Sequence, residues 1–559
     1  MRDFSVIERS DYDLIVIGGG INGAGTARDG ALRGLKTLLV EKGDFAGGTT
    51  GWSTRLIHGG LRYLEYFEFN LVRESLKERE ILLKIAPHLV KPIQMTIPLY
   101  AGGARSYWEI QAGMVLYDLL SFDKTLPNHR MLPAPKMRQL FRAVNAEGLK
   151  GAAQYYDSQV AYAERLGLET VLSAKQAGAD VFNYAAVTQI DRNTDRAIAV
   201  TVRDELTQKE YTVAVGAQTV IVNTSGPWVD EVCALGQKGK QNAPIGDRKL
   251  GGTKGSHILV DSFPGAPDTA LYAEAQADGR PYFIVPWLNR YLIGTTDRYY
   301  DGDLDRVKAD NEEIDYLIAE TNRIIPTAQL SREDVKFTYA GIRPLPYAKE
   351  GTKPSSVTRA HILHDHKDEG VNNLISLIGG KLTTYRQVAE ELVNGVYRKR
   401  GEPIVPCTTA TTPLPGAIAP NDPRIVRAII DWEKTLSPTR IAHLFTLYGA
   451  RAMEVLDIVK QDRELAEPIV PHLPDIKAQI VYAVEREMAH TLVDLCHHRT
   501  TLALQDNYGL DAIAQILPCL EKYCHWDLET RDRAVANYHA YLQAHNLPDY
   551  DYQATHLRR

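Results

Sequence analysis

The stretch from residue 13 to residue 41 constrains the fold of this chain more than any other. A β-rich run that ends at Ile17 leads into three consecutive glycines, and a helical stretch follows to about Arg33. A second apolar run, 37–40, then ends at Glu41. Strand, glycine turn, helix, strand and acid in this order are typical of a dinucleotide-binding unit. We therefore predict that residues 13–41 form a βαβ element that binds a dinucleotide.

The three glycines of this fingerprint have separate expected tasks. Gly18 permits the tight turn, Gly20 lets the backbone approach a pyrophosphate, and Gly23 allows the helix to pack close to the strand. The N-terminus of that helix directs free N–H groups at the phosphates. Glu41, 18 residues after Gly23, is placed to accept hydrogen bonds from a ribose, which argues against NADP. The fingerprint alone does not separate NAD from FAD.

The composition is that of a globular protein and indicates no nucleic-acid partner. Of the 559 residues, 24% are charged and 44% hydrophobic, and the formal net charge is −6. This length allows about two to four domains. The N-terminal residues lack an apolar signal core, and no window approaches 18 uninterrupted apolar residues. We therefore expect neither export nor a membrane-spanning helix, whereas association with a membrane surface stays open.

Two regions with different sequence patterns follow one another along the chain. Up to about residue 384, short β-rich runs alternate with helices and glycine turns. Prolines at 413, 415, 420 and 423 then block regular structure and indicate a linker. Beyond it, Ser437 is an expected helix N-cap, and the apolar pattern of 475–497 predicts one continuous helix. We expect this helical region to pack against the rest of the chain or against a second subunit.

No metal site is expected. The five cysteines contain no C-x-x-C pair and are expected to be reduced thiols. Four acids between residues 301 and 312 have the spacing of EF-hand ligands, but Arg306 stands where that loop needs glycine. A solvated acidic loop is the better interpretation. The histidines next to Cys496 are interpreted as polar neighbours in a buried helix.

After Glu41, a stretch rich in glycine, serine and threonine extends to Leu61, where a nicotinamide-binding unit would proceed to its next helix and strand. This stretch and later motifs resemble the FAD-dependent, quinone-linked glycerol-3-phosphate dehydrogenases, in order and spacing and over nearly the whole chain. The motifs are IGGGINGAG (17–25), LIHGGLRYLE (56–65), VNTSGPW (222–228), KGSHILV (254–260), IGTTD (293–297), AGIRPL (340–345), GGKLTTYR (379–386) and HHRTTL (497–502). Two departures are visible: Thr224-Ser225 replaces the family's usual Ala-Thr, and Trp52 stands where small residues are common.

The resemblance implies an α/β FAD-binding Rossmann-like domain of the glutathione-reductase or D-amino-acid-oxidase type. An inserted, mainly antiparallel β substrate domain and an all-α C-terminal domain complete the expected fold. The oxidoreductase domain is expected over 1–405, with FAD-binding parts at about 11–85, 150–235 and 350–400. Its substrate-binding parts are expected at about 86–149 and 236–349. A proline-rich linker over 406–423 and a helical domain over 424–559 follow.

FAD is the cofactor that the resemblance implies. The residues expected to bind it come from the fingerprint, the glycine-rich stretch after it, and the motifs near 225 and 380. They are Gly18, Gly20, Ile21, Asn22, Gly23, Glu41, Lys42, Thr49, Thr50, Ser53, His58, Gly59, Gly60, Ser225, Gly226, Gly380, Lys381, Leu382 and Thr383.

Oxidation of a secondary alcohol by a flavin needs a well-placed donor C–H, a base for the hydroxyl proton, a clamp for the phosphate, and positive charge for the reduced ring. His257 is the expected base, because its unperturbed pKa lies near the operating pH. A structural histidine is the alternative from the residue alone. Arg343, held in extended backbone by Pro344, offers bidentate recognition of phosphate or stabilises a developing alkoxide.

Three further residues complete the expected substrate site. By resemblance, Arg62 and Tyr63 help to bind the substrate, although pairing of Arg62 with a nearby glutamate is an alternative. Lys381 precedes an expected helix N-terminus and adds positive charge near the flavin or contacts the substrate. The expected catalytic residues are His257, Arg343 and Lys381, which are also counted among the substrate-binding residues.

The resemblance implies oxidation of sn-glycerol 3-phosphate to dihydroxyacetone phosphate, with electrons passed to a membrane quinone. It also implies a cytoplasmic protein attached peripherally to the membrane, and a homodimer is left open. A glycerol-3-phosphate oxidase that reduces O2 to H2O2 is the nearest alternative. Such oxidases often carry an insertion in the substrate domain, and no long unexplained segment is visible here. Another flavin amine or amino-acid oxidase and a non-catalytic dinucleotide-binding module are further alternatives.

Overall fold

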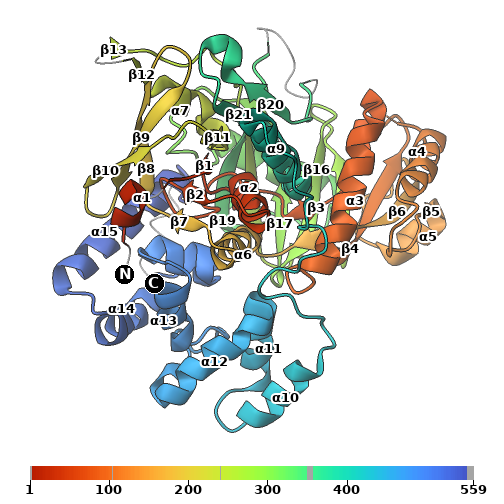
Figure 1. The fold of residues 1–559 in the computed structure, drawn as a ribbon. Helices are drawn as coiled ribbons and strands as arrows, with labels where there is room; N and C mark the ends of the chain where they lie inside the picture. Colours follow the sequence, from red (N-terminus) through yellow and green to blue (C-terminus); the bar gives the residue numbers. More distant parts are fainter. Residues whose placement is uncertain (1–2, 10, 104, 239–240, 349–356, 551–559) are drawn as a thin grey trace.

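The computed structural model describes residues 3–9, 11–103, 105–238, 241–348 and 357–550. In this part of the chain, three β-sheets are packed together with a group of C-terminal helices (Figure 1). Residues 350–356 of the predicted FAD-binding part and 551–559 of the predicted helical domain lie outside the described residues. Among the described helices, none combines the length and the apolar character that a membrane crossing requires.

The first sheet has six strands in the order β20-β21-β11-β1-β2-β7. The strands are β1 (Leu14–Ile17), β2 (Thr37–Val40), β7 (Asp180–Phe182), β11 (Val220–Asn223), β20 (Ile362–Asp365) and β21 (Leu374–Ile378). β20 is antiparallel to β21, and the other neighbours are parallel. The four central strands are wholly buried, as parallel strands covered on both faces must be. The predicted Rossmann-like core is therefore confirmed.

Alternate residues of β1 face two different layers, because successive side chains of a strand point to opposite faces. Leu14 and Val16 share a core with α2 (Ile21–Leu32), α6 (Ala163–Gln176) and α9 (Tyr385–Arg400). Ile15 and Ile17 share another core with a five-stranded sheet of order β10-β9-β8-β12-β13. Its strands are β8 (Ala185–Arg192), β9 (Ala197–Asp204), β10 (Glu210–Ala214), β12 (Gly236–Lys238) and β13 (Gln241–Asn242).

The third sheet has ten strands, eight of them in the order β18-β14-β17-β16-β15-β4-β6-β3, while β19 pairs with β14 and β5 with β6. The strands are β3 (Leu56–Ile57), β4 (Val90–Tyr100), β5 (Arg130–Pro133), β6 (Leu149–Val160), β14 (Thr253–Val260), β15 (Ala270–Glu274), β16 (Pro281–Trp287), β17 (Arg290–Gly294), β18 (Arg298–Tyr299) and β19 (Val335–Arg343). β15 is parallel to β4, and the other described pairs are antiparallel. The predicted mainly antiparallel sheet is thus present, and the exact domain boundaries stay predictions.

Several helices border these sheets. α3 (Phe69–Ile85), α4 (Tyr107–Leu120) and α5 (Ala134–Leu140) pack on β6 at one margin of the molecule, the right side of Figure 1. α8 (Asn311–Ile324) packs on β14, and α7 (Val229–Ala234) packs on β21. The short helix α1 (Ser5–Arg9) lies against β10.

The C-terminal region is helical, as predicted. Its helices are α10 (Pro423–Trp432), α11 (Pro438–Tyr448), α12 (Ala452–Gln461), α13 (Lys477–Arg486), α14 (Leu510–Cys524) and α15 (Leu528–His545). Residues 402–422 before them contain neither helix nor strand, and the linker over 406–423 stays a prediction. The side chain of Ser437 accepts a hydrogen bond from the Arg440 backbone N–H, as its predicted capping role requires.

The prediction of one continuous helix over 475–497 is wrong. α13 ends at Arg486, Met488 has φ of +57°, and a short π-helix (Asp494–Arg499) follows. At this break the Glu487 carbonyl accepts a hydrogen bond of 2.8 Å from the Arg499 guanidinium. Both segments contribute to the same core, so the apolar pattern runs on through the break.

Buried ion pairs join the helical region to the rest of the chain. Arg499 donates two hydrogen bonds, of 2.6 and 2.9 Å, to Asp44 in the loop after β2. Arg165 of α6 makes a bidentate pair with Glu487 at 2.9 and 2.7 Å. All four side chains are almost completely buried. Breaking one side of such a pair leaves an uncompensated buried charge, so these contacts hold the two regions together.

Candidate active site

The glycine turn between β1 and α2 is shaped by close packing at two positions and is open at the third. A β-carbon at Gly18 would lie 2.7 Å from Ser225 Cα, and one at Gly23 would lie 1.8 Å from the Gly18 carbonyl oxygen. Gly18 also has φ of +102°. A β-carbon at Gly20 would meet nothing closer than Thr50 Oγ1, at 3.5 Å. The space above Gly20 is therefore not used by the fold, and a side chain there would fill it.

Polar groups border this space. The Ile21 N–H, at the start of α2, donates to Thr50 Oγ1 over 3.0 Å, and Asn22 Oδ1 is buried without a hydrogen-bond partner among the described residues. The Glu41 carboxylate accepts hydrogen bonds from the backbone N–H groups of Gly19 at 2.6 Å and Gly43 at 2.8 Å. Burial raises the pKa of Glu41, and the two N–H groups oppose that rise. Each carboxylate oxygen retains a lone pair for a ribose hydroxyl. A dinucleotide fits this set.

The glycine-rich stretch after β2 is fixed to distant elements. The Thr49 hydroxyl donates to the Ile342 carbonyl at 2.7 Å, and the Ser53 carbonyl accepts from Tyr339 of the same strand, β19, at 2.7 Å. Further on, the His58 N–H donates to Thr383 Oγ1 and the Gly59 N–H donates to Tyr117. The ammonium group of Lys42 pairs with Asp305 at 2.5 Å. Gly60 has φ of +73° and leads into the 3-10 helix η1 (Leu61–Tyr66).

The remaining predicted cofactor residues follow β11 and β21, the strands beside β1. Ser225 and Gly226 come directly after β11, whereas Gly380, Leu382 and Thr383 come after β21. The carboxyl ends of β1, β11 and β21 lie at the same edge of the sheet, because these strands are parallel neighbours. Ligands of open α/β sheets bind at that edge. A β-carbon at Gly380 would lie 2.9 Å from the Asn22 amide nitrogen, so the loop after β21 meets the first turn of α2.

His257 is a buried, neutral imidazole in the middle of β14. Its Nε2 lies 2.9 Å from Thr54 Oγ1, and its ring stacks on Tyr339 with centroids 4.7 Å apart. Nδ1 is buried without a hydrogen-bond partner in the described part of the chain. Burial, and after it the charges of Arg343 and Arg55, hold the pKa of His257 well below its usual value. Gly294 on β17 faces this ring, and a β-carbon there would lie 2.4 Å from His257 Cδ2.

Arg343, at the end of β19, belongs to a cluster of three arginines around one carboxylate. Its guanidinium donates to Asp297 at 3.0 Å and to the Thr295 hydroxyl at 3.0 Å. Arg280 and Arg359 also pair with Asp297, the latter at 3.3 Å. Burial raises the pKa of Asp297, but the three guanidinium groups outweigh burial and lower it to about 2. Three positive charges on one negative charge leave an excess of about two, which suits an anion.

Lys381 and Tyr63 lie against each other beside this cluster. Lys381 Nζ is 4.7 Å from the centroid of the Tyr63 ring and donates to Ser75 at 2.8 Å. Burial lowers the pKa of Lys381 to about 8, against the opposing charges of two glutamates. Burial raises the pKa of Tyr63, whereas the charges of Arg359 and Arg343 lower it, so the ring lies within reach of the cluster.

Arg62 contacts Tyr66 at 3.4 Å, and its Nε is buried without a partner among the described residues. Of the two glutamates that were its alternative partners, Glu65 pairs with Arg105, and Glu68 accepts a hydrogen bond from Thr358. The charge of Arg343 reaches both His257 and Tyr63, and Lys381 contacts the Tyr63 ring. The charge of Arg62 also reaches Tyr63.

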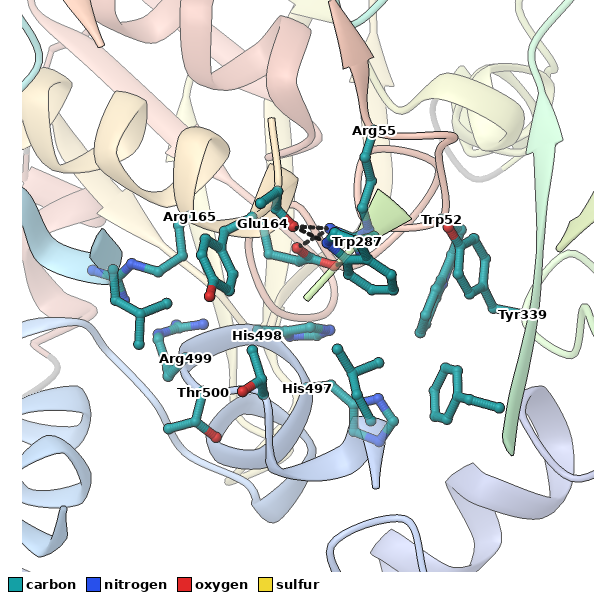
Figure 2. A pocket seen from close by; sticks show the side chains of 16 residues that line it. Trp52, Arg55, Glu164, Arg165, Trp287, Tyr339, His497, His498, Arg499 and Thr500 are labelled. Carbon is teal, nitrogen blue, oxygen red and sulfur yellow. Dashed lines mark hydrogen bonds and ion pairs between the residues drawn. The ribbon is translucent and has the colours of Figure 1, made fainter. Parts of the chain in front are cut away.

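Sequence reasoning missed Arg280, Asp297 and Arg359. Asp297 is the last residue of the IGTTD motif, which offered a signal, but the two arginines lie in segments without a motif. Sequence reasoning also gave no account of Trp52. Its ring lies 5.2 Å from Tyr339 and 6.4 Å from His497 of the helical region. These side chains are among those that line a cavity (Figure 2). The volume of the cavity is about 20 Å³, which is room for about one water molecule.

The fold and the site define a flavin-type dinucleotide oxidoreductase, and comparisons with known proteins agree. Residues 13–386 match the family model of FAD-dependent oxidoreductases, and residues 407–531 match that of the C-terminal domain of alpha-glycerophosphate oxidase. A glycerol-3-phosphate dehydrogenase of Synechocystis sp. is 60% identical over 98% of this chain and 100% of that protein. An aerobic glycerol-3-phosphate dehydrogenase of Staphylococcus aureus is 33% identical over 88% of this chain and 87% of that protein.

A solved structure agrees with these relatives. The glycerol-3-phosphate dehydrogenase of Bacillus halodurans, complexed with FAD, has 30% sequence identity and a TM-score of 0.77, covering 97% of this chain and 96% of that one. The chain therefore belongs to the family of FAD-dependent glycerol-3-phosphate dehydrogenases. FAD is its cofactor, and the open space above Gly20 with the polar groups around it fits that group.

Proposed function

We propose that the protein oxidises sn-glycerol 3-phosphate to dihydroxyacetone phosphate and passes the electrons to a membrane quinone. The observation that carries this proposal is the arginine cluster on Asp297 beside the neutral, buried imidazole of His257. An anion clamp next to a base is what a phosphorylated alcohol needs. FAD, when bound, supplies the acceptor for the hydride that leaves C2 of the substrate.

His257 takes the proton of the C2 hydroxyl in this proposal. With Nε2–H donating to Thr54 Oγ1, Nδ1 is the acceptor nitrogen that no described side chain uses. The lowered pKa keeps the imidazole unprotonated at neutral pH, so the base is in its working form. The His257 ring stacks on Tyr339, and His257 is paired with Gly294 of the neighbouring strand β17; both contacts fix the plane of the imidazole.

Arg343 and Arg359 hold the phosphate in this proposal, with Asp297 orienting their guanidinium groups. The Arg343 guanidinium donates to Asp297, to the Thr295 hydroxyl and to the Thr296 carbonyl, and a guanidinium carries five N–H groups. A phosphate takes such donors in pairs. Lys381 adds a positive charge next to the N-terminus of α9, and Tyr63 packs against its ammonium group. Arg62 is assigned to substrate binding as well.

The nineteen residues expected to bind FAD keep that assignment as a proposal. Two observations support it. The loops after β1, β11 and β21 lie at the same edge of the sheet, and the space next to Gly20 is open to a ligand. Quinone as acceptor is favoured by the curated relatives, which are named dehydrogenases. The helical domain, by contrast, matches a model named after an oxidase, so oxygen is the acceptor to test against.

Anaerobic titration of the purified protein tests the reaction. We expect the yellow flavin to be bleached by glycerol 3-phosphate and not by glycerol, because glycerol lacks the group that the arginines bind. Failure of glycerol 3-phosphate to bleach the flavin would refute the proposed substrate. Turnover in air is then compared with turnover on a short-chain quinone. Stoichiometric peroxide with no quinone reduction would establish the oxidase instead.

A further inference from the structure

Two histidines and a glutamate meet at the end of β20, the edge strand of the first sheet, which lies beside β21 (Figure 1). His364 belongs to β20, and the 3-10 helix η5 (His366–Glu369) follows that strand directly. His364 Nε2 lies 3.3 Å from Glu369 Oε1, and His366 Nδ1 forms a hydrogen bond with the other carboxylate oxygen. One ligand atom from each residue lies within 4.8 Å of the others. We call His364, His366 and Glu369 the β20 cluster.

The spacing of the β20 cluster suits a zinc ion. Bonds from zinc to imidazole nitrogen and carboxylate oxygen are roughly 2.0–2.2 Å long, so neighbouring ligands of a tetrahedral ion lie about 3.3–3.6 Å apart. The 3.3 Å between His364 Nε2 and Glu369 Oε1 has this value. The rings of His364 and His366 are nearly perpendicular, with centroids 4.6 Å apart. Two imidazoles and one carboxylate are a ligand set that zinc uses in proteins.

A hydrogen bond from β21 holds His366 in place on the side away from Glu369. His366 Nε2 lies 2.7 Å from Ser376 Oγ, and the imidazole is completely buried. Histidines that bind metals use their second ring nitrogen in this way, which fixes the ring and its tautomer. When Nε2–H donates to Ser376, the lone pair of Nδ1 faces the Glu369 carboxylate, and a cation fits between them. In the other tautomer Nδ1–H donates to Glu369, which holds the cluster together without an ion.

Lys249 competes for the same carboxylate. Its ammonium group pairs with Glu369 Oε1 at 3.1 Å and donates to the Asp247 carbonyl at 2.8 Å. Zinc and this ammonium group therefore repel each other, and zinc binding weakens the contact of Lys249 with Glu369. The side chains of His364 and Glu369 are 32% and 23% exposed, so an ion can reach the cluster from solvent.

We propose that the β20 cluster binds a zinc ion through His364 Nε2, His366 Nδ1 and the Glu369 carboxylate, with water completing the coordination. β20 runs antiparallel to β21, so the cluster lies beside the start of β21, whereas the cofactor loop with Gly380 follows its end. The ion joins η5 to the edge strand β20 and takes no part in the proposed reaction, which this inference goes beyond. Zinc binding here corrects the expectation, drawn from the sequence, that the chain has no metal site.

Calorimetric titration of the full-length, FAD-loaded protein with Zn²⁺, after dialysis against a chelator, tests the proposal. We expect wild type to bind a single zinc ion at this site and His364→Ala to bind it at least about tenfold more weakly. The matched control is His539→Ala, at an exposed histidine of α15, which should bind zinc like wild type. Mg²⁺ should not replace zinc, because it prefers six oxygen ligands. Zinc should raise the melting temperature of wild type by at least about 2 °C, and that of His364→Ala by less.

Two further variants distinguish the β20 cluster from weak binding by surface histidines. Lys249→Met should bind zinc at least about threefold more tightly than wild type, because Glu369 loses its competing ammonium partner. His364→Cys should keep the site, and with Co²⁺ as the probe it should gain a thiolate-to-metal charge-transfer absorption that wild type lacks. Flavin absorbance equal to that of wild type, measured in chelator, shows that each variant is folded. The lack of a zinc site in wild type, or equal zinc affinity of wild type and His364→Ala, would overturn the proposal.

Discussion

Replacement of Asp297 by asparagine should lower stability and strengthen anion binding at the same time. Asp297 has a completely buried side chain, and its pKa falls from an ordinary 3.8 to about 2 because the arginine charges outweigh burial. At 1.36 kcal/mol per pH unit, this change corresponds to about 2.5 kcal/mol of stabilisation. A depressed carboxyl pKa stabilises the fold above the unfolded pKa and loses that contribution as pH falls from about 4 to about 2. At neutral pH the full amount is present, and Asp297→Asn removes it.

The same substitution removes a negative charge from the anion site. Unit charges about 6–8 Å apart interact by roughly 0.5–0.7 kcal/mol at the dielectric constant of water and roughly 2–3 kcal/mol at that of a protein surface, so phosphate affinity should rise at least about twofold. The assay is thermal unfolding of wild type and Asp297→Asn across a titration of inorganic phosphate. We expect a lower melting temperature without phosphate and a larger rise with it. An unchanged melting temperature together with weaker phosphate binding would refute the role of Asp297 as counter-ion of the cluster.

Three other substitutions address the cofactor, the pH dependence and the domain contact. Gly20→Val should yield folded protein with little flavin absorbance per mole, because its side chain fills the open space above the turn; full flavin occupancy would contradict this. Lys381 has a pKa lowered to about 8, so its charge is lost above that pH and the KM for glycerol 3-phosphate should rise by up to about tenfold per pH unit. In Lys381→Arg the KM should no longer rise with pH. A wild-type KM that stays constant from about pH 7 to 10 would exclude Lys381 as a group whose charge binds the substrate. Arg499→Met should cost up to about 3–5 kcal/mol, seen in chemical unfolding, because it removes the guanidinium that pairs with the buried carboxylate of Asp44, which keeps its hydrogen bonds with His498 and Asn183; a loss below about 1 kcal/mol would show that the domains are joined by other contacts.

The cofactor half of the molecule could be predicted from sequence because its signals are local. The glycine turn, the strand 37–40 and the end of the helix near residue 33 follow from turn chemistry and periodicity within one short segment. The fold class also follows, since every motif of the resemblance lies within a continuous run. His257 and Arg343 could be named from their motifs, and the structure brings them into one neighbourhood.

The charge balance of the site could not be predicted, because it depends on segments far apart in the chain. Arg280, Asp297 and Arg359 meet only after β16 and β17 are paired and the loop before β20 returns. The break after Arg486 could not be predicted for a related reason. Apolar periodicity carries no information about the ion pair of Glu487 with Arg165, which lies on another element. The surroundings of Trp52 also depend on distant segments, because its ring lies against Tyr339 of β19 and His497 of the helical region.

The rate of flavin reduction in His257→Ala, measured by anaerobic stopped flow against glycerol 3-phosphate concentration, tests the central claim most directly. The claim is that a neutral His257, beside an anion site that holds the phosphate, takes the hydroxyl proton as the hydride leaves. The account predicts a fall of roughly 10²–10⁴-fold in the limiting rate, with the substrate concentration for half-maximal rate little changed. A limiting rate close to wild type would remove His257 from the base role and contradict the account.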